Sequence, residues 1–342
     1  MNNLKSKNFI FRKNCYNCGS DIKQKYSDIQ DKTFYSSGKW NLYECSSCKL
    51  IQLNPYPSEE IIGQYYETYY THQQDKEFVD RSLQRLERLV FSYSLGYVNA
   101  VGRTYFDRLR YWLIPSGVVN IVEYSLFRVH KDWGSRILDV GCGDGSFLKK
   151  MKDLGWMVKG LDFDKKAADF AKKEFGINVQ VGDLNDIDPK NEQYDVIVYS
   201  HVFEHLYDLK GELEKCYKLL DKNGRVVALT PNSDSLEHKL FAKNWRGLEP
   251  PRHIMIFNPR NLKEVAEQAG FKVQTMTTTA RSARHLFGAS MMILKNKKPT
   301  ASGGGRGLMI AALSYLFQPI EYLLNLLSRN IGEEIYVVLS KD

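Results

Sequence analysis

Between residues 136 and 279 the chain alternates short runs of aliphatic and β-branched residues with longer amphipathic stretches. The runs read RILDV, MVKGL, INVQV, YDVIVYS, GRVVALT and FKVQTMTTT, and a seventh, EEIYVVL, closes the chain at 333–339. Apolar runs separated by helical stretches are typical of a parallel sheet whose two faces are covered by helices. The pattern predicts an α/β fold with a doubly wound, seven-stranded and mostly parallel sheet.

The segments outside this alternation have other patterns. The stretch IIGQYYETYY carries four tyrosines, which occur both on packed helix surfaces and in pocket lids, and helical periodicity follows up to Val129. The sequence KNKKPTASGGGRG is typical of a linker, and polar residues interrupt the apolar run after it, as in a kinked amphipathic helix rather than a membrane span. We therefore expect a ribbon at 1–55, a helical cap and linker at 56–133, a core at 134–280 and 331–342, and a helical insertion at 281–330.

Composition and charge narrow the class of protein. Of the 342 residues, 43% are hydrophobic and 26% are charged, which indicates a packed core and excludes a disordered or collagen-like chain. The net charge of +8 predicts only a weak attraction to phosphates or anionic headgroups. No apolar run of signal-peptide length precedes Cys15, so we expect a cytoplasmic protein.

Four of the six cysteines form two closely spaced pairs. Cys15 and Cys18 lie in CYNCG, and Cys45 and Cys48 lie in CSSC. In a reducing compartment such pairs are more often metal ligands than disulfides. Two such turns can direct four thiolates at one ion, which suits tetrahedral structural zinc and leaves no open position for a catalytic water. The spacing predicts a structural Zn²⁺ site in an N-terminal ribbon.

The first core strand leads directly into a glycine-rich loop, DVGCGDGS, which a helical stretch follows. Three alternate glycines permit a tight turn and a close approach of a ligand to the backbone, and the new helix presents unpaired N–H groups. The spacing is GxGxG, whereas dinucleotide-binding folds have GxGxxG. The loop therefore predicts a ligand site at the end of this strand.

The segment LDVGCGDG resembles the first motif of class I S-adenosylmethionine-dependent methyltransferases. The segments GLDFD, VGDLND and YDVIVYSHVFEHL resemble later motifs of that family in the same order. The resemblance covers about 134–280 and the last strand, and it implies S-adenosyl-L-methionine as cofactor. It places Asp162 on the ribose hydroxyls, which a carboxylate can bind with two hydrogen bonds, and Asp183 near the adenine amino group. The implied cofactor-binding residues are Asp139, Gly141, Cys142, Gly143, Gly145, Asp162, Phe163, Asp183, Leu184, Ser200 and His201.

The segment HVFEH after the fourth strand has the HxxEH pattern of some metallopeptidases, but those enzymes carry it on a helix. It also resembles the ExxEH segment of ubiquinone-pathway O-methyltransferases, in which such side chains can bind a divalent ion. Here His201 replaces the first acid, so metal dependence stays open. We expect Glu204 and His205 to lie near the substrate.

A second polar cluster follows the fifth strand. The stretch WRGLEPPRHIMIFNPRNL resembles a segment of bacterial methyltransferases of surface-polysaccharide and natural-product pathways. His253 is a candidate general base, because an unperturbed pKa of about 6.5 suits deprotonation of a hydroxyl, although it can also cap the loop. The expected catalytic residues are His253, His205 and Glu204, and the expected substrate-binding residues are Trp245, Arg246 and Arg252. The alternative for Trp245 and Arg252 is that they simply anchor the loop.

Together these patterns predict a methyltransferase that acts on a sugar hydroxyl of a glycan, nucleotide sugar or lipid-linked saccharide. The amphipathic segments 103–127 and 308–328 favour peripheral contact with the inner face of a membrane. Sugar C-methylation and O-methylation of a quinone or other small molecule are alternatives. An RNA methyltransferase is disfavoured because the chain lacks an NPPY-type loop, so nucleic acid is not an expected partner. A cofactor-binding scaffold without turnover is the non-enzymatic alternative.

Overall fold

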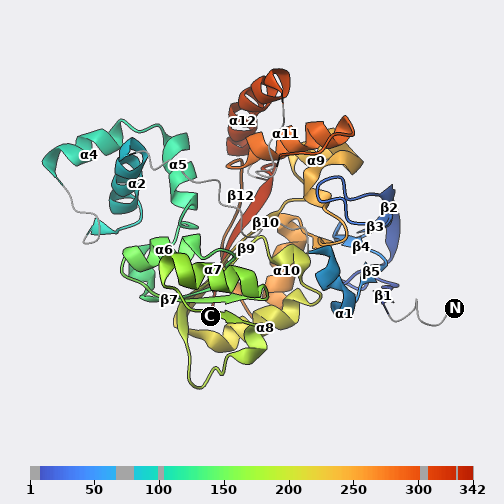
Figure 1. Ribbon diagram of the computed structural model, residues 1–342, viewed down its shortest axis with the longest axis horizontal. Helices are drawn as coiled ribbons and strands as arrows, with labels where there is room; N and C mark the ends of the chain where they lie inside the picture. Colours follow the sequence, from blue (N-terminus) through green and yellow to red (C-terminus); the bar gives the residue numbers. More distant parts are fainter. Residues whose placement is uncertain (1–7, 67–80, 99–103, 301–306, 329, 342) are drawn as a thin grey trace.

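A seven-stranded sheet forms the centre of the protein (Figure 1). The structure is a computed structural model that describes residues 8–66, 81–98, 104–300, 307–328 and 330–341. The strand order is β8, β7, β6, β9, β10, β13, β12. Five strands are parallel: β6 (Arg136–Val140), β7 (Met157–Asp162), β8 (Val179–Val181), β9 (Tyr194–Ser200) and β10 (Leu220–Pro231). The last strand, β13 (Glu334–Ser340), is antiparallel to both of its neighbours, β10 and β12 (Lys272–Thr279). The predicted mostly parallel α/β fold is confirmed.

The order of the strands creates a crevice at one edge of the sheet. From β6 the chain builds outward through β7 and β8, and it then returns to place β9 on the other side of β6. Open α/β sheets bind ligands at such a reversal, outside the carboxyl ends of the strands. The glycine loop after β6 and the polar segment after β9 therefore face each other across this crevice.

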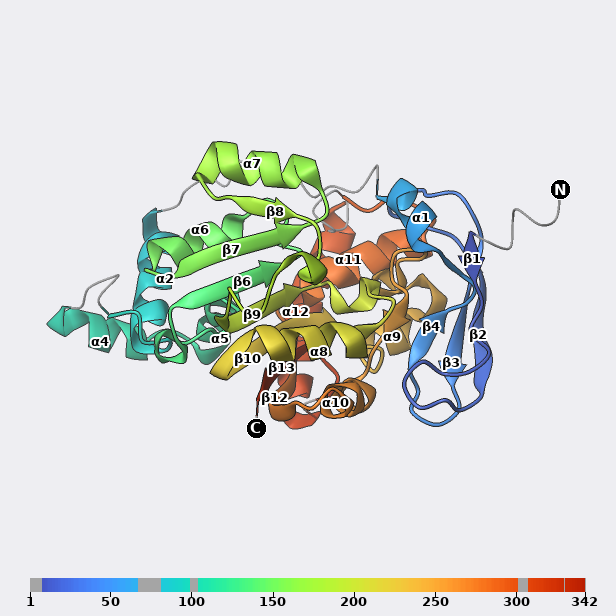
Figure 2. The same ribbon diagram turned by 90° about the horizontal axis from the view of Figure 1, so that it is seen from below.

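Residues that alternate along the strands pack into two separate cores. Leu138 belongs to the core beneath α8 (Leu209–Leu219) and α10 (Pro259–Gln268), whereas Ile137 faces the core beneath α2 (Arg81–Tyr93), α5 (Ser116–Tyr124) and α6 (Ser146–Asp153). A further helix of the core, α7 (Lys165–Phe175), lies beside β7 and β8 (Figure 2). Such period-two alternation buries both faces of the sheet.

The N-terminal ribbon is joined to this core by backbone pairing. Its sheet contains β2 (Ile22–Ile29), β3 (Trp40–Cys45) and β4 (Ile51–Leu53), and β4 pairs with β11 (Met255–Ile256) from the segment after β10. A second small sheet pairs β1 (Phe9–Ile10) with β5 (Tyr56–Pro57). Buried ribbon residues such as Leu42 and Leu53 share one hydrophobic core with Leu213 and Leu262. The ribbon therefore packs as a wall of the core rather than as a tethered module.

The remaining helices lie in the cap, after β10 and in the insertion. They are α1 (Glu59–Ile62), α4 (Tyr105–Trp112), α9 (Leu236–Phe241), α11 (Ala283–Leu294) and α12 (Leu308–Ser328). Helix α12 is continuous over 21 residues and contains Pro319. Among the described residues, α12 is the one helix that is both long enough and apolar enough to cross a membrane. Figure 1 shows α12 projecting from the body beside α11.

Candidate functional site

A cavity of about 570 Å³ opens at the crevice where the carboxyl ends of β6, β7 and β9 meet. Seven of the expected cofactor-binding residues line it, namely Gly141, Gly143, Asp162, Phe163, Asp183, Ser200 and His201. His205, one of the expected catalytic residues, also lines it. The cavity is large enough for a nucleoside-sized ligand, since ligand pockets typically measure about 300–1,000 Å³.

The glycine loop forms one wall of this cavity. Gly141 and Gly143 have φ angles of +72° and +53°, in the left-handed region that favours glycine. A Cβ atom at position 141 would lie 2.6 Å from Val202 Cγ2 on the opposite wall. The loop therefore needs glycine there both for its conformation and for the width of the crevice.

Asp162 at the end of β7 is fixed with its carboxylate toward this loop. Its two oxygens accept hydrogen bonds from the backbone N–H groups of Gly143 and Asp164, each at 2.8 Å. Each carboxylate oxygen can accept more than one hydrogen bond, so both can still receive a hydroxyl. The carboxylate is thus buried, oriented and adjacent to the cavity, as binding of a ribose diol requires.

Four expected cofactor residues lie behind the cavity wall. Leu184 and Cys142 are buried, and Gly145 is packed against helix α7, where a Cβ would lie 2.9 Å from Ala171. Asp139 is buried beneath the loop, and burial together with the charge of Asp162 raises its pKa to about 8. Its Oδ1 has no hydrogen-bond partner among the described residues, which suits contact with a cationic group through water. These residues shape the loop instead of lining the cavity.

His201 lies where β9 ends, with a φ angle of +54°. Its Nε2 lies 2.8 Å from Glu334 Oε1 and its Nδ1 lies 3.3 Å from Glu204 Oε1. Desolvation would lower the pKa of His201, but the hydrogen bonds and charges of the two carboxylates raise it to about 10. His201 is therefore an imidazolium at neutral pH and is unsuited to act as a general base.

The two carboxylates that hold His201 are buried and ionised. Burial would raise the pKa of each carboxyl group. His201 instead lowers the pKa of Glu204 to about 2, and Arg281 together with His201 lowers the pKa of Glu334 to about 2. Arg281 Nε donates to Glu334 Oε2 at 2.8 Å, and Thr230 donates to Glu204 Oε2 at 2.8 Å. The charges of His201 and Arg281 thus balance those of Glu204 and Glu334 next to the cavity. Glu204 serves as a buried residue that holds His201 in place.

His205 is the one expected catalytic residue that lines the cavity. Its Nδ1 lies 2.9 Å from the carbonyl oxygen of Arg252 and 3.0 Å from the hydroxyl of Tyr66. A carbonyl oxygen only accepts hydrogen bonds, so the imidazole proton lies on Nδ1 and the Nε2 lone pair remains available. This tautomer suits a general base.

The structure places His253 away from the cavity. Its side chain is buried, its Nδ1 bonds the carbonyl oxygen of Gly247 at 2.8 Å, and burial lowers its pKa to about 4. The expectation of a base at His253 therefore does not fit its surroundings, which match the loop-capping alternative. The sequence leaves metal dependence open for His201, Glu204 and His205. The ligand atoms that lie within 4.8 Å of one another are instead those of Glu204, His205 and His253, so these three residues can hold a cation.

The expected substrate-binding residues after β10 are turned toward the ribbon. Trp245 and Arg246 line a separate cavity of about 360 Å³ between this segment and the ribbon, and Trp245 stacks on His238. Arg252 is fully buried and donates to Asp31 Oδ2 at 2.9 Å and to Glu249 Oε1 at 3.0 Å. Because its side chain is fully buried, Arg252 has no access to a substrate. It instead joins the ribbon to the core through Asp31.

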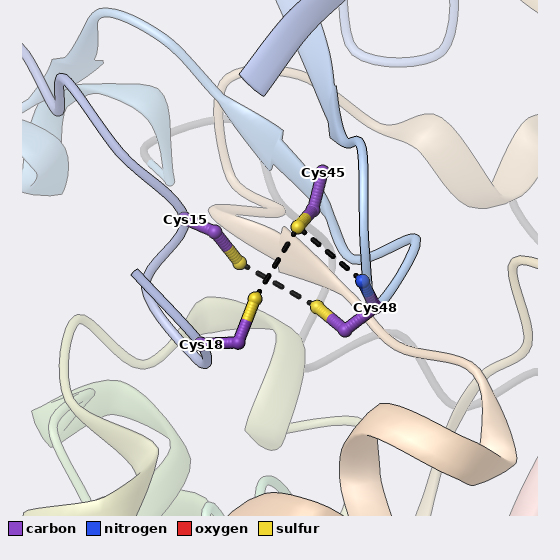
Figure 3. Close-up of side chains that lie close together, drawn as sticks. All are labelled: Cys15, Cys18, Cys45 and Cys48. Carbon is purple, nitrogen blue, oxygen red and sulfur yellow. Dashed lines mark hydrogen bonds between the residues drawn. The ribbon is translucent and has the colours of Figure 1, made fainter. Parts of the chain in front are cut away.

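The four predicted metal ligands converge from two loops of the ribbon (Figure 3). The Sγ atoms of Cys15 and Cys48 lie 3.5 Å apart, and those of Cys18 and Cys45 lie 3.4 Å apart. All four sulfur atoms lie within 4.8 Å of one another, and none forms a disulfide. The backbone N–H groups of Ser47 and Cys48 point at Cys45 Sγ, as is favourable for a thiolate. The cluster can hold one tetrahedral ion.

Several residues that line the cavity were not predicted from the sequence. Glu59, Ile62 and Tyr66 belong to the segment after the ribbon, while Tyr207 and Glu212 follow the HVFEH segment. The ring of Tyr66 meets that of Phe163 edge to face at 5.3 Å. The tyrosine-rich pattern of 61–70 was the available signal. Tyr66 lines the cavity and Tyr65 is buried, whereas Tyr69 and Tyr70 lie outside the described residues.

Comparisons with known proteins agree with this geometry. Residues 121–276 match the family model described as "Methyltransferase domain". A "Probable S-adenosylmethionine-dependent methyltransferase" of Mycolicibacterium smegmatis is 27% identical over 146 residues, which are 42% of this chain and 55% of that protein. The mitochondrial "Ubiquinone biosynthesis O-methyltransferase" of Mus musculus is 30% identical over 158 residues, covering 42% of this chain and 43% of that protein.

The chain thus spans about half the length of the curated relatives it matches. A solved S-adenosylmethionine-dependent methyltransferase from Mesorhizobium loti aligns over 64% of this chain and 97% of its own, with 16% identity and a TM-score of 0.44. The family match and the strand order agree on the same segment. Residues 121–276 are thus similar to a methyltransferase domain.

Proposed function

We propose that this protein is an S-adenosylmethionine-dependent methyltransferase that methylates a hydroxyl group, with His205 as the general base. The observation that carries the proposal is the cavity that has Asp162 and the glycine loop on one side and His205 on the other. S-adenosylmethionine supplies an electrophilic methyl group on a sulfonium, which needs no protein nucleophile. The residues of this chain bind, orient and remove a proton.

Each wall of the cavity has a task in this proposal. Asp162 holds the ribose diol, and Asp183 and Phe163 lie at the adenine end. His205 Nε2 takes the proton of the acceptor hydroxyl, while its Nδ1 stays fixed on the Arg252 carbonyl. Positioning of the two reactants accounts for most of the acceleration, and a general base adds about 10²–10⁴-fold.

For the acceptor we propose a sugar hydroxyl of a glycan, a nucleotide sugar or a lipid-linked saccharide, methylated in the cytoplasm. The resemblance of the segment around Trp245 to enzymes of surface-polysaccharide pathways supports this class. A quinone-type small molecule is the second candidate, because several curated relatives are named as ubiquinone biosynthesis O-methyltransferases. The four-cysteine cluster is proposed to bind structural Zn²⁺ and to stiffen the ribbon, to which Arg252 is bonded through Asp31.

The test is methyl transfer from methyl-labelled S-adenosylmethionine. Purified protein is incubated with the labelled cofactor and fractionated extract, and the label is partitioned among saccharide, lipid, RNA and small-molecule pools. Label in saccharide, lost in His205→Gln but kept in His253→Gln, supports the proposal. Label in a quinone-class molecule selects the second candidate, label in RNA refutes both, and cofactor binding without any transfer identifies a scaffold.

A further inference from the structure

Helix α12 turns four of its polar residues inward, beside the buried Ile310 and Phe317. The residues of α12 that face the protein include Ser314, Gln318, Glu321 and Asn325, and Glu321 is fully buried. Ser314 donates to its own helix backbone, Gln318 donates to the carbonyl oxygen of Arg281, and Asn325 bonds Thr278 and Gly332. A surface helix of a water-soluble protein normally has the opposite arrangement.

The outward side of α12 is apolar along its whole length. Leu313, Leu316, Ile320, Leu323 and Leu327 follow one another at spacings of three and four residues and are 40–85% exposed. The helix has a single charged residue, Glu321, which is buried. A contiguous exposed apolar surface of this kind marks a site of contact with a membrane or another protein.

The charge of the segment that contains α12 favours a membrane over another protein as the partner. The insertion at 281–330 contains one acid, Glu321, against seven basic residues, so it contributes +6 of the net charge of +8; the basic residues are Arg281, Arg284, Lys295, Lys297, Lys298, Arg306 and Arg329. The Arg284 guanidinium lies 4.6 Å from the centre of the Tyr315 ring on α12 itself. An exposed leucine-rich helix within a strongly cationic segment of the chain complements an anionic bilayer.

A second copy of the chain fits α12 less well. Helices that pair with each other carry charged residues beside their apolar seam, which set partner and register. On α12 the residues beside the seam, such as Tyr315, Leu324 and Leu326, are themselves apolar and exposed. The apolar band is therefore wider than a helix-pairing seam.

The surface continues past α12 into a groove. A cavity of about 710 Å³ lies between α5, β12 and α12, and Ile121, Tyr322 and Leu326 line it together with Thr277 and Arg281. Arg281 is bonded to Glu334, and Glu334 is bonded to His201 of the cofactor cavity. A molecule that is anchored in the lipid beside α12 and enters this groove would reach Arg281. Through Glu334, Arg281 is linked to His201 in the wall of the proposed active site.

We propose that the outward face of α12, with the basic residues of the insertion, docks this protein on the surface of an anionic lipid bilayer. The helix lies in the interface with its leucines in the acyl region, and the exposed lysines of the insertion, Lys295, Lys297 and Lys298, contact the headgroups. This inference goes beyond methyl transfer and does not depend on it, because docking needs neither cofactor nor acceptor.

The test is binding of the full chain to vesicles of phosphatidylcholine alone or with phosphatidylglycerol. We expect binding to the anionic vesicles, at least tenfold weaker in Leu316→Ser/Leu323→Ser and weakened by salt. The control is Phe11→Ser/Met157→Ser, which changes two side chains exposed to similar extents, 61% and 62%, on other parts of the surface. It should bind as the wild type does.

Thermal unfolding of each variant shows that the fold is kept, and light scattering reports the oligomeric state. Unchanged vesicle binding in the α12 variant overturns the proposal. No vesicle binding by the wild type, with a dimer that the α12 substitutions convert to a monomer, also overturns it and assigns the face to a second copy. Failure of methyl transfer with normal vesicle binding would refute the proposed function alone.

Discussion

Replacement of Arg252 by methionine tests whether the ribbon and the core form one unit. The Arg252 side chain is fully buried and donates four hydrogen bonds, to Asp31, Glu249, the Ser36 hydroxyl and the Tyr65 carbonyl, at 2.9–3.1 Å. Arg252→Met keeps much of the apolar stem but leaves these acceptors without the cation.

The expected loss in the free energy of unfolding follows from what each partner keeps. Removal of one member of a buried ion pair typically costs about 3–5 kcal/mol, since it leaves a buried charge uncompensated. Here Asp31 still accepts hydrogen bonds from three backbone N–H groups, and Glu249 still pairs with Arg246. The loss should therefore fall near the lower limit, about 3 kcal/mol, which is a large share of a typical stability of about 5–15 kcal/mol.

Urea unfolding followed by tryptophan fluorescence measures this loss. The matched control is Arg260→Met, which breaks the exposed Arg260–Glu264 pair and should cost less than about 0.5 kcal/mol. A double-mutant cycle with Asp31→Asn should show that the two substitutions are less than additive, because both break the same contact. If Arg252→Met is no more costly than Arg260→Met, the ribbon is not anchored through this residue.

Four further outcomes are expected. Asp162→Asn should weaken binding of S-adenosylhomocysteine in calorimetry by about 10–100-fold, since hydrogen bonds to a charged group contribute about 1.5–3 kcal/mol, whereas Asp153→Asn on the exposed end of α6 should not. His205→Gln should lower the rate of methyl transfer by about 10²–10⁴ while cofactor affinity is kept, and equal loss of affinity would contradict a role as base. His201 has a raised pKa of about 10, so its contribution to stability is complete below about pH 6.5 and declines as pH rises toward 10; urea titrations of His201→Gln should lack this decline. Metal analysis should find about one zinc per chain, absent in Cys45→Ser and retained in Cys216→Ser, whose thiol is buried in the core.

The parts of the fold and site that were predictable from sequence are those encoded by short segments. The strand, glycine loop and helix around Gly141 are contiguous, and Asp162 ends the next strand, so a local pattern specifies both. The CxxC pairs are local in the same way, because two tight turns need only a hairpin to meet. Register and topology then place these segments at one edge of the sheet.

The residues that were not predictable depend on docking between distant segments. Arg252 was expected at a substrate surface because its chemistry suits a sugar, but its partner Asp31 lies 221 residues away, and no local pattern shows that pairing. Tyr66 reaches the cavity only because the ribbon packs against the core. His253 and His205 have the same side chain, and the sequence does not tell their roles apart. Burial makes His253 a structural histidine, whereas its place in the lining of the cavity makes His205 a candidate base.

One residue, Arg252, connects the ribbon to the chemistry through two of its groups. Its side chain binds Asp31 of the ribbon and the carbonyl of Tyr65, and its backbone carbonyl fixes the proton of His205 on Nδ1. The neighbour of Tyr65 in the chain, Tyr66, contacts the same imidazole. A shift of the ribbon would therefore move both Tyr66 and the carbonyl oxygen that holds the proton of His205 on Nδ1. An ion bound by the four cysteines would thus act on the site at a distance, because by stiffening the ribbon it would also stiffen the support of the proposed base.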